Sequence, residues 1–116
     1  MQIVEKYLAA WNERDADERR ARVIDAFTQQ AAYKDPLMQG AGHDAIDALI
    51  AAAQGQFPGH RFALDGAPDS HHDVVRFSWT LGVPGNAPVA KGTDMALIAG
   101  DGRLASVTGF IDYFAQ

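Results

Sequence analysis

The sequence predicts an α+β domain in which the helices come first and an antiparallel sheet follows. Up to about residue 56 the apolar residues recur mainly at helical spacing, and from about residue 61 they alternate with polar residues. A chain of 116 residues favours one domain spanning 1–116. The helices and the sheet of one small domain have to pack against each other as layers.

Three segments have one apolar face at helical spacing: 3–11, about 17–27 and about 43–56. The residues of these faces are Ile3, Val4, Tyr7, Leu8 and Trp11, then Val23, Ile24 and Phe27, then Ile46, Leu49, Ile50 and Ala53. A short segment, 31–34, ends at Asp35-Pro36, where the proline favours extended backbone for Asp35. Glycines predict a loop at 40–42 before the third helix.

Four strands are expected, at 61–64, 73–83, 89–98 and 104–114. A turn rich in proline and glycine separates the second from the third, and Asp101-Gly102 predicts a hairpin before the fourth. The helices should cover one face of this sheet. A strongly curved sheet closed over by helices leaves a conical cavity.

Two aspartates occupy positions where burying a charged carboxylate would cost free energy. Asp94 interrupts a run, 92–98, that otherwise reads as a buried strand, and Asp35 follows the helical first quarter. A buried carboxylate has to be paired, hydrogen-bonded or protonated. The pair therefore predicts a pocket with a polar floor, suited to acid–base chemistry or ligand binding.

Composition excludes several classes of function. The net charge of −5 argues against a nucleic-acid partner, and the chain has no cysteine. No apolar run approaches the ~18 residues of a membrane span, so no membrane partner is expected and a cytoplasmic location is the default. The histidines lack metal-ligand spacing and no phosphate loop is visible, so we expect neither a metal nor a cofactor.

The order of motifs resembles the NTF2-like superfamily, and more narrowly its SnoaL-like polyketide-cyclase group. The resemblance runs over the whole chain, from two helices through Tyr33-Lys34-Asp35-Pro36, Phe57-Pro58-Gly59, Arg76-Phe77-Ser78-Trp79 and Gly92-Thr93-Asp94 to Val107-Thr108-Gly109-Phe110. It implies a cystatin-like cone, in which three N-terminal helices pack on a strongly curved antiparallel sheet. The superfamily includes isomerases, cyclases, lyases, epoxide hydrolases and non-catalytic domains.

Within that superfamily, ketosteroid isomerases carry a tyrosine on the first helix, a general-base aspartate before a proline and a protonated aspartic acid on a later strand. In this chain the matching positions are Tyr7, Asp35 and Asp94. The resemblance implies that Asp35 moves a proton while Asp94, with Tyr7 beside it, donates a hydrogen bond to the developing charge. The other reading is structural: Asp35 forms a turn with Pro36, Asp94 has a protein partner, and Tyr7 is a core residue.

Aromatic and flexible side chains should line the pocket, with Trp11 and Phe110 the best candidates for its walls and Met38 for a lid. The expected ligand-binding residues are Trp11, Tyr33, Met38, Phe57, His60 and Phe110. Such a lining favours a hydrophobic small molecule. The predicted function is a cofactor-independent isomerase, cyclase or lyase acting on a hydrophobic carbonyl compound.

Two alternatives remain open. The first is a non-catalytic ligand-binding or dimeric scaffold domain. The second is an epoxide hydrolase that would use Asp35, Asp94 and an arginine, either Arg61 or Arg76. Under all three readings we expect a homodimer, as the resemblance implies. We expect it to form through an outer sheet face made of Val75, Phe77, Trp79 and Leu81.

Overall fold

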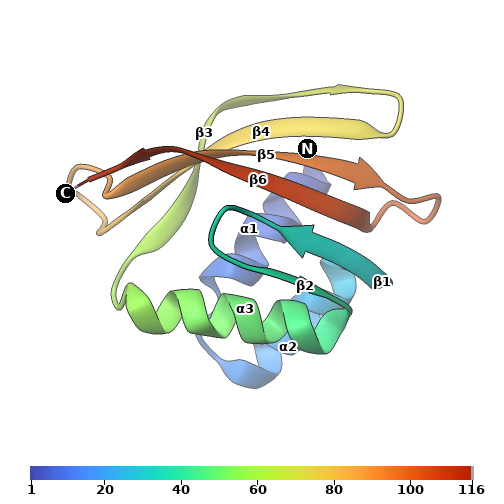
Figure 1. Cartoon of the computed structure of the whole chain (residues 1–116), viewed down its shortest axis with the longest axis horizontal. Coiled ribbons are helices and arrows are strands. Elements are labelled where there is room, and N and C mark those ends of the chain that lie inside the picture. Colours follow the sequence, from blue (N-terminus) through green and yellow to red (C-terminus); the bar gives the residue numbers. More distant parts are fainter. Residues whose placement is uncertain (116) are drawn as a thin grey trace.

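A computed structural model describes residues 1–115 and confirms the α+β, NTF2-like arrangement, with the helices on one side of a curved sheet (Figure 1). The helices are α1 (Gln2–Asn12), α2 (Ala16–Ala26) and α3 (His43–Gln56). The strands are β1 (Phe27–Lys34), β2 (Gln39–Ala41), β3 (Arg61–His71), β4 (Val74–Gly82), β5 (Ala90–Ile98) and β6 (Leu104–Phe114).

The six strands form one sheet in the order β2-β1-β6-β5-β4-β3. The hairpins β3–β4, β4–β5 and β5–β6 are antiparallel, as expected, whereas β1 pairs in parallel with β6. The sheet is thus mostly antiparallel, as expected, and the strands β1 and β2, with the parallel pair that joins β1 to β6, are additions that the sequence did not predict. A parallel pair joins segments far apart in sequence, so local turn signals cannot reveal it.

The second helix ends earlier than its apolar spacing predicts. Phe27 is already extended (φ −118°, ψ 144°) and begins β1, although it continues the helical spacing of Val23. No glycine or proline marks this helix end. Phe27, Ala31 and Tyr33 are the buried positions of β1, and the other positions are polar except for Ala32, so the alternation of the strand is weak.

Two other boundaries differ from the prediction. The glycine loop at 40–42 contains most of the short strand β2, and β3 continues past Leu64 to His71 instead of ending there. Gly66 has a φ of 79°, and the register of β3 against β4 shifts nearby, between Asp65 and Asp69. His71 is the last residue of β3, and His72 lies in the turn before β4 with a φ of 51°.

The faces of β4 are the reverse of the expected arrangement. Val75, Phe77 and Leu81 are 0%, 2% and 5% exposed and belong to the interior, so the prediction that they form an outer dimer face was wrong. Alternation shows that a strand has two faces but does not show which face the helices cover. The apolar faces of the helices take the more apolar side of the sheet.

A cluster of hydrogen bonds and one ion pair links the three helices at one end of the core. The buried side chain of Gln54 on α3 donates to the backbone oxygens of Trp11 and Glu13 at the end of α1. Arg19 on α2 donates to Gln54 and forms an ion pair with Asp47 at 2.8 Å. These contacts fix the end of α1, which carries two of the candidate site residues. Within residues 1–115, no helix is long and apolar enough to cross a membrane.

Candidate active site

An apolar cavity lies between the helices and the inner face of the sheet. The cavity has a volume of about 70 Å³, which is enough for a few water molecules. The cavity therefore suits a small ligand, or a larger one only after side chains move. Its lining comprises Tyr7, Leu8, Trp11, Tyr33, Asp35, Leu37, Met38, Ala53, Phe57, Phe62, Trp79, Leu81, Ala90, Asp94, Gly109, Phe110, Ile111 and Phe114.

Asp94 is the buried carboxylate of this cavity. It points inward from the middle of β5 and is 2% exposed, while its neighbour Met95 faces outward and is 47% exposed. The Tyr7 hydroxyl donates to Asp94 Oδ2 at 2.7 Å, and the Trp79 indole Nε1 donates to Oδ1 at 3.1 Å. Each carboxylate oxygen thus accepts one hydrogen bond from the protein.

Burial raises the pKa of Asp94 to about 6. The hydrogen bonds from Tyr7 and Trp79 oppose this rise because they stabilise the carboxylate, whereas the negative charges of Asp35 and Asp112 add to it. The direction is the one expected for an aspartate in an apolar pocket. A pKa of about 6 still leaves the group mostly ionised at pH 7, with roughly one molecule in ten protonated.

Asp35 organises the loop at the mouth of the cavity. Its Oδ1 accepts hydrogen bonds from the backbone nitrogens of Leu37 (2.8 Å) and Met38 (3.0 Å), and its Oδ2 accepts one from the Tyr33 hydroxyl (2.5 Å). This is the turn with Pro36 that the structural reading anticipates. Asp35 also lines the cavity, so the two readings do not exclude each other.

Gly109 on β6 brings the two aspartates to one place. It pairs with Asp94 in the sheet. A Cβ atom at position 109 would lie 2.7 Å from Asp94 Oδ1 and 3.3 Å from the Cβ of Asp35. Both side chains therefore occupy the space above a glycine, and a larger residue would displace at least one of them.

The two tyrosines beside the aspartates are held in their protonated form. Burial is the largest cause of the raised pKa of both Tyr7 and Tyr33. The charge of Asp94 adds to the rise for each of them, and the hydrogen bond to Asp35 does so for Tyr33. Both hydroxyls consequently stay protonated, and can donate hydrogen bonds, at neutral pH.

Trp79 is the site residue that sequence reasoning missed as a ligand of Asp94. It stands on the inner face of β4, and its ring lies against Gly92 of β5, where a Cβ would be 2.1 Å from the indole Cζ2. The absence of a side chain at Gly92 lets the indole lie flat on the strand and reach Asp94. A glycine two residues before a buried aspartate, opposite an inward tryptophan, is the signal that could have revealed this contact.

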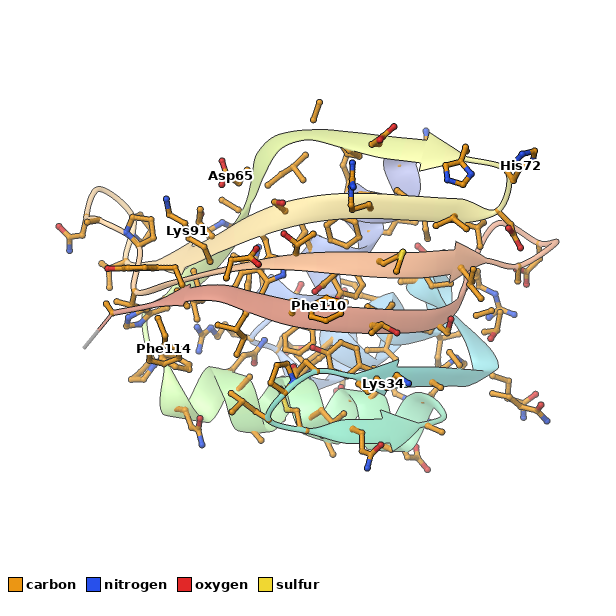
Figure 2. The ribbon with its side chains drawn as sticks, turned by 45° about the horizontal axis from the view of Figure 1, so that its top comes forward. Lys34, Asp65, His72, Lys91, Phe110 and Phe114 are labelled. Carbon is orange, nitrogen blue, oxygen red and sulfur yellow. The ribbon has the colours of Figure 1, made fainter. Side chains whose placement is uncertain are left out.

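The expected ligand-binding residues divide into three groups. Trp11, Tyr33, Met38 and Phe57 line the cavity. Phe110 borders its mouth and is 55% exposed, so it is a rim residue rather than a wall (Figure 2). The sixth residue, His60, does not line the cavity; its ring packs on Phe57 and its Nδ1 contacts the Pro58 oxygen.

Neither arginine considered for an epoxide hydrolase site reaches the cavity lining. Arg76 faces outward, where it pairs with Asp69, and Arg61 is an exposed residue at the start of β3. The charged side chains in the lining, as far as the described residues go, are Asp35 and Asp94. In the same part of the chain, no three histidine or acidic side chains gather as a metal would require.

Comparison with known proteins agrees with the fold. The family model for the SnoaL-like domain matches residues 4–107. A solved structure from Agrobacterium tumefaciens, provisionally named an isomerase of the SnoaL-like family, is 47% identical, with 97% of this chain and 96% of that one covered and a TM-score of 0.92.

More distant structures share the fold alone. One from Sinorhizobium meliloti, provisionally named a polyketide cyclase, is 22% identical over 94% of each chain, with a TM-score of 0.70. An NTF2-like protein of unknown function from Exiguobacterium is 15% identical over 95% of this chain and 98% of that one, with a TM-score of 0.74. A comparison with curated proteins found no match. The match over nearly the whole length, together with the cone and its aspartate-floored cavity, shows that this chain belongs to the SnoaL-like family of the NTF2-like superfamily.

Proposed function

We propose that the cavity binds a small hydrophobic carbonyl compound and that the protein moves a proton on it, as a cofactor-independent isomerase or cyclase. One observation carries the proposal: a buried aspartate with a pKa of about 6 lies in the wall of an apolar cavity. Perturbed acids in apolar clefts are frequent at catalytic sites. The similarity to a SnoaL-like protein provisionally named an isomerase supports the same class of reaction.

We assign the proton-accepting role to Asp94. A general base works best when its pKa lies near the working pH, and a carboxylate with a pKa of about 6 satisfies this at neutral pH. It is mostly ionised there, and its burial keeps water from solvating the charge. The sequence expectation gave this role to Asp35 and made Asp94 the proton donor, but an Asp94 that accepts two hydrogen bonds is arranged as a carboxylate.

Asp35 has a supporting role in this proposal. Three donors already occupy its two oxygens, so few of its lone pairs are free to contact a substrate. Its charge nevertheless contributes to the raised pKa of Asp94, and its hydrogen bonds hold the loop that carries Leu37 and Met38 against the cavity. Asp35 therefore adds to the basicity of Asp94 and shapes the mouth of the cavity.

The proposed step is a balanced proton transfer. Asp94 takes the proton from the carbon next to the carbonyl group, the C–H electrons form the enolate, and the same carboxyl group returns the proton to carbon. When the proton returns to another carbon, the step completes an isomerisation. If the enolate carbon instead attacks a second carbonyl group within the substrate, a C–C bond closes a ring, the C=O π electrons move to oxygen, and the Asp94 carboxyl group gives its proton to the resulting alkoxide. Neither outcome requires an oxidant or a metal.

Exchange of the α-hydrogens of a ketone in deuterium oxide tests the proposal directly. Purified protein is incubated with cyclohexanone, indanone or tetralone, and deuterium incorporation is followed by NMR. Asp94→Asn should reduce the exchange rate by about 10²- to 10⁴-fold, the usual contribution of a general base. Asp65→Asn, at an exposed position on β3, is the matched control and should leave the rate unchanged. Equal rates in wild type and Asp94→Asn would exclude Asp94 as the base.

A non-catalytic ligand-binding domain is the second candidate. The narrow cavity favours it, as do the two protein donors that already satisfy Asp94, because a buried carboxylate can be a structural group. The same ketones discriminate the two functions. Saturable binding without enzyme-dependent exchange of any α-hydrogen would favour the non-catalytic domain.

We also propose that the protein forms a homodimer through the outer face of the sheet. Met95 and Leu97 lie on β5 and are 47% and 44% exposed. Phe110 lies on β6 (Figure 2) and is 55% exposed. Exposed apolar side chains grouped on one sheet face are typical of a contact surface. The sequence predicted a dimer surface made of Val75, Phe77, Trp79 and Leu81. Those side chains face inward, so the proposed surface consists of Met95, Leu97 and Phe110 instead.

A further inference from the structure

Trp11 carries a buried hydrogen-bond donor without an acceptor. The side chain is 4% exposed, and within residues 1–115 its indole Nε1 is the one buried side-chain nitrogen or oxygen that has no hydrogen-bond partner. Native proteins satisfy the great majority of such groups, because leaving one unpaired costs free energy. An exception that lines a cavity calls for a functional reason.

The indole of Trp11 sits where the polar floor of the cavity meets its aromatic wall. Its ring centroid lies 5.5 Å from that of Tyr33, 5.4 Å from that of Phe62 and 6.2 Å from that of Tyr7. Tyr7 in turn donates to Asp94, and Tyr33 donates to Asp35. The Trp11 N–H also lies close enough to the Tyr7 hydroxyl to oppose the rise in the pKa of Tyr7, although the two groups form no hydrogen bond of normal geometry. The N–H group is therefore near Tyr7, which itself donates to the proposed base.

The other tryptophan of the cavity provides an internal comparison. The Nε1 of Trp79 has an acceptor on Asp94, and Trp79 is held in place against Gly92. The hydroxyls of Tyr7 and Tyr33 also have acceptors. Among these four donors around the floor, the Trp11 N–H is the one left for a ligand.

The charges of the lining restrict what that ligand can be. Asp35 and Asp94 are the formally charged side chains of the described lining, and both are negative. An anionic ligand would meet two like charges in a cavity lined mainly by apolar side chains, where repulsion is strong. A neutral molecule meets no such repulsion, and its oxygen can accept a hydrogen bond from an indole N–H.

We propose that Trp11 is the recognition donor of the cavity and that the site selects neutral ligands whose carbonyl oxygen accepts from its Nε1–H. This inference rests on the proposed function and names its substrate class: an uncharged ketone or related carbonyl compound without a carboxylate or phosphate group. In the proton transfer from carbon to Asp94, negative charge develops on this oxygen. The Trp11 N–H then stabilises the enolate more strongly than it stabilises the ketone.

NMR of the two tryptophan side chains tests the inference. Protein labelled with nitrogen-15 at tryptophan gives one indole N–H signal for Trp11 and one for Trp79, assigned with Trp11→Phe and Trp79→Phe. The labelled protein is titrated with indanone, with indane, which has the same skeleton without the oxygen, and with indane carboxylate. Cyclohexanone and tetralone extend the ketone series to smaller and larger sizes.

The Trp11 proton signal should lie further downfield in a ketone complex than in the indane complex, because only the ketone offers an acceptor. Indane carboxylate should bind at least about tenfold more weakly than indanone. Trp11→Phe should weaken indanone binding by about 3- to 10-fold, the usual effect of one neutral hydrogen bond, and leave indane binding nearly unchanged. The chemical-shift comparison uses the wild-type protein and does not depend on how well the variant folds.

Two results would overturn the inference. One is a Trp11 signal that none of the three ketones moves relative to indane, or that lies upfield throughout because the N–H points at an aromatic ring. The other is tighter binding of the carboxylate than of the ketone. Failure of the proposed function looks different: the ketone shifts the Trp11 signal, but its α-hydrogens do not exchange in an Asp94-dependent way.

Discussion

Gly109 and Asp94 face each other across β5 and β6, and a Cβ atom on Gly109 would lie 2.7 Å from Asp94 Oδ1. The same atom would lie 3.3 Å from the Cβ of Asp35. The two carboxylates of the candidate site therefore share the space that one missing side chain leaves. The geometry of the site therefore depends on Gly109, which has no side chain to take part in the reaction.

Gly109→Ala should damage the site without removing any of its functional groups. The new methyl group forces Asp94 or Asp35 to move, so proton exchange on a ketone should fall by about 10-fold or more. The free energy of unfolding should fall by about 1–3 kcal/mol, the usual cost of overpacking. Gly100→Ala is the matched control, because a Cβ there meets nothing within 4 Å, and it should change neither quantity appreciably. Exchange rates and urea denaturation measure the two effects, and a fully active Gly109→Ala would show that Asp94 and Asp35 need no such space.

Asp94→Asn should gain stability relative to the wild type as the pH rises from about 4 to above 6. The pKa of Asp94 is about 6 in the folded state, against roughly 3.9 in an unfolded chain, so the folded state binds this proton more tightly. The contribution of Asp94 to stability is therefore largest below pH 4 and declines as the pH rises to about 6, with a total change of up to about 3 kcal/mol. Asparagine carries no charge, so the advantage of the variant should appear across this range.

Urea denaturation of both proteins between pH 4 and pH 8 measures this difference, with Asp65→Asn as the exposed control. A difference in stability between variant and wild type that stays constant from pH 4 to pH 8 would contradict the raised pKa. A constant loss would indicate that asparagine only disturbs the two hydrogen bonds that Asp94 accepts.

The pH dependence of ketone exchange separates the two roles considered for Asp94. A base has to be ionised, so the rate should rise with pH through about 6 and then level off. If Asp94 were instead the proton donor, the rate would fall through the same range. A profile measured from pH 5 to pH 8 decides between them, and a falling limb would return the base role to Asp35.

Tyr7→Phe should move the midpoint of that profile upward. The Tyr7 hydrogen bond is the largest contribution that lowers the pKa of Asp94, so its loss leaves burial less opposed. The variant should consequently lose more activity at pH 6 than at pH 8. Its stability should fall by about 1 kcal/mol, because the aromatic ring remains and one hydrogen bond is lost. A midpoint that stays in place would mean that Tyr7 does not act through Asp94.

Light scattering after size-exclusion chromatography tests the outer sheet face. The wild type should elute as a dimer, and Met95→Lys combined with Leu97→Lys should give a folded monomer, because charges replace the exposed apolar side chains. Ile24→Lys introduces a charge at a comparably exposed position on α2 and should leave the dimer intact. A monomeric wild type at micromolar concentration would exclude this interface.

Short-range patterns predicted those elements whose partners are close in sequence. The three antiparallel hairpins from β3 to β6 follow from alternation and turn residues, and α1 and α3 follow from their apolar faces. β1 was missed because its stability comes from β6, about 75 residues away, and because Phe27 also fits the helical spacing. β2 was missed because two of its three residues read as a glycine loop.

The site divides in the same way. The sequence by itself identified Asp94 and Asp35 as the two carboxylates of a pocket, and the resemblance added Tyr7 and a role for each residue, since residue type and order are enough to locate an expensive charge. Only the tertiary structure decided that Trp79 is a second donor to Asp94, that Gly109 makes room for both aspartates, that His60 lies outside the cavity and that the Trp11 N–H has no acceptor. These depend on distances of a few ångströms between segments far apart in the chain. Such distances are set by how helices and strands pack, and no local pattern in the sequence encodes them.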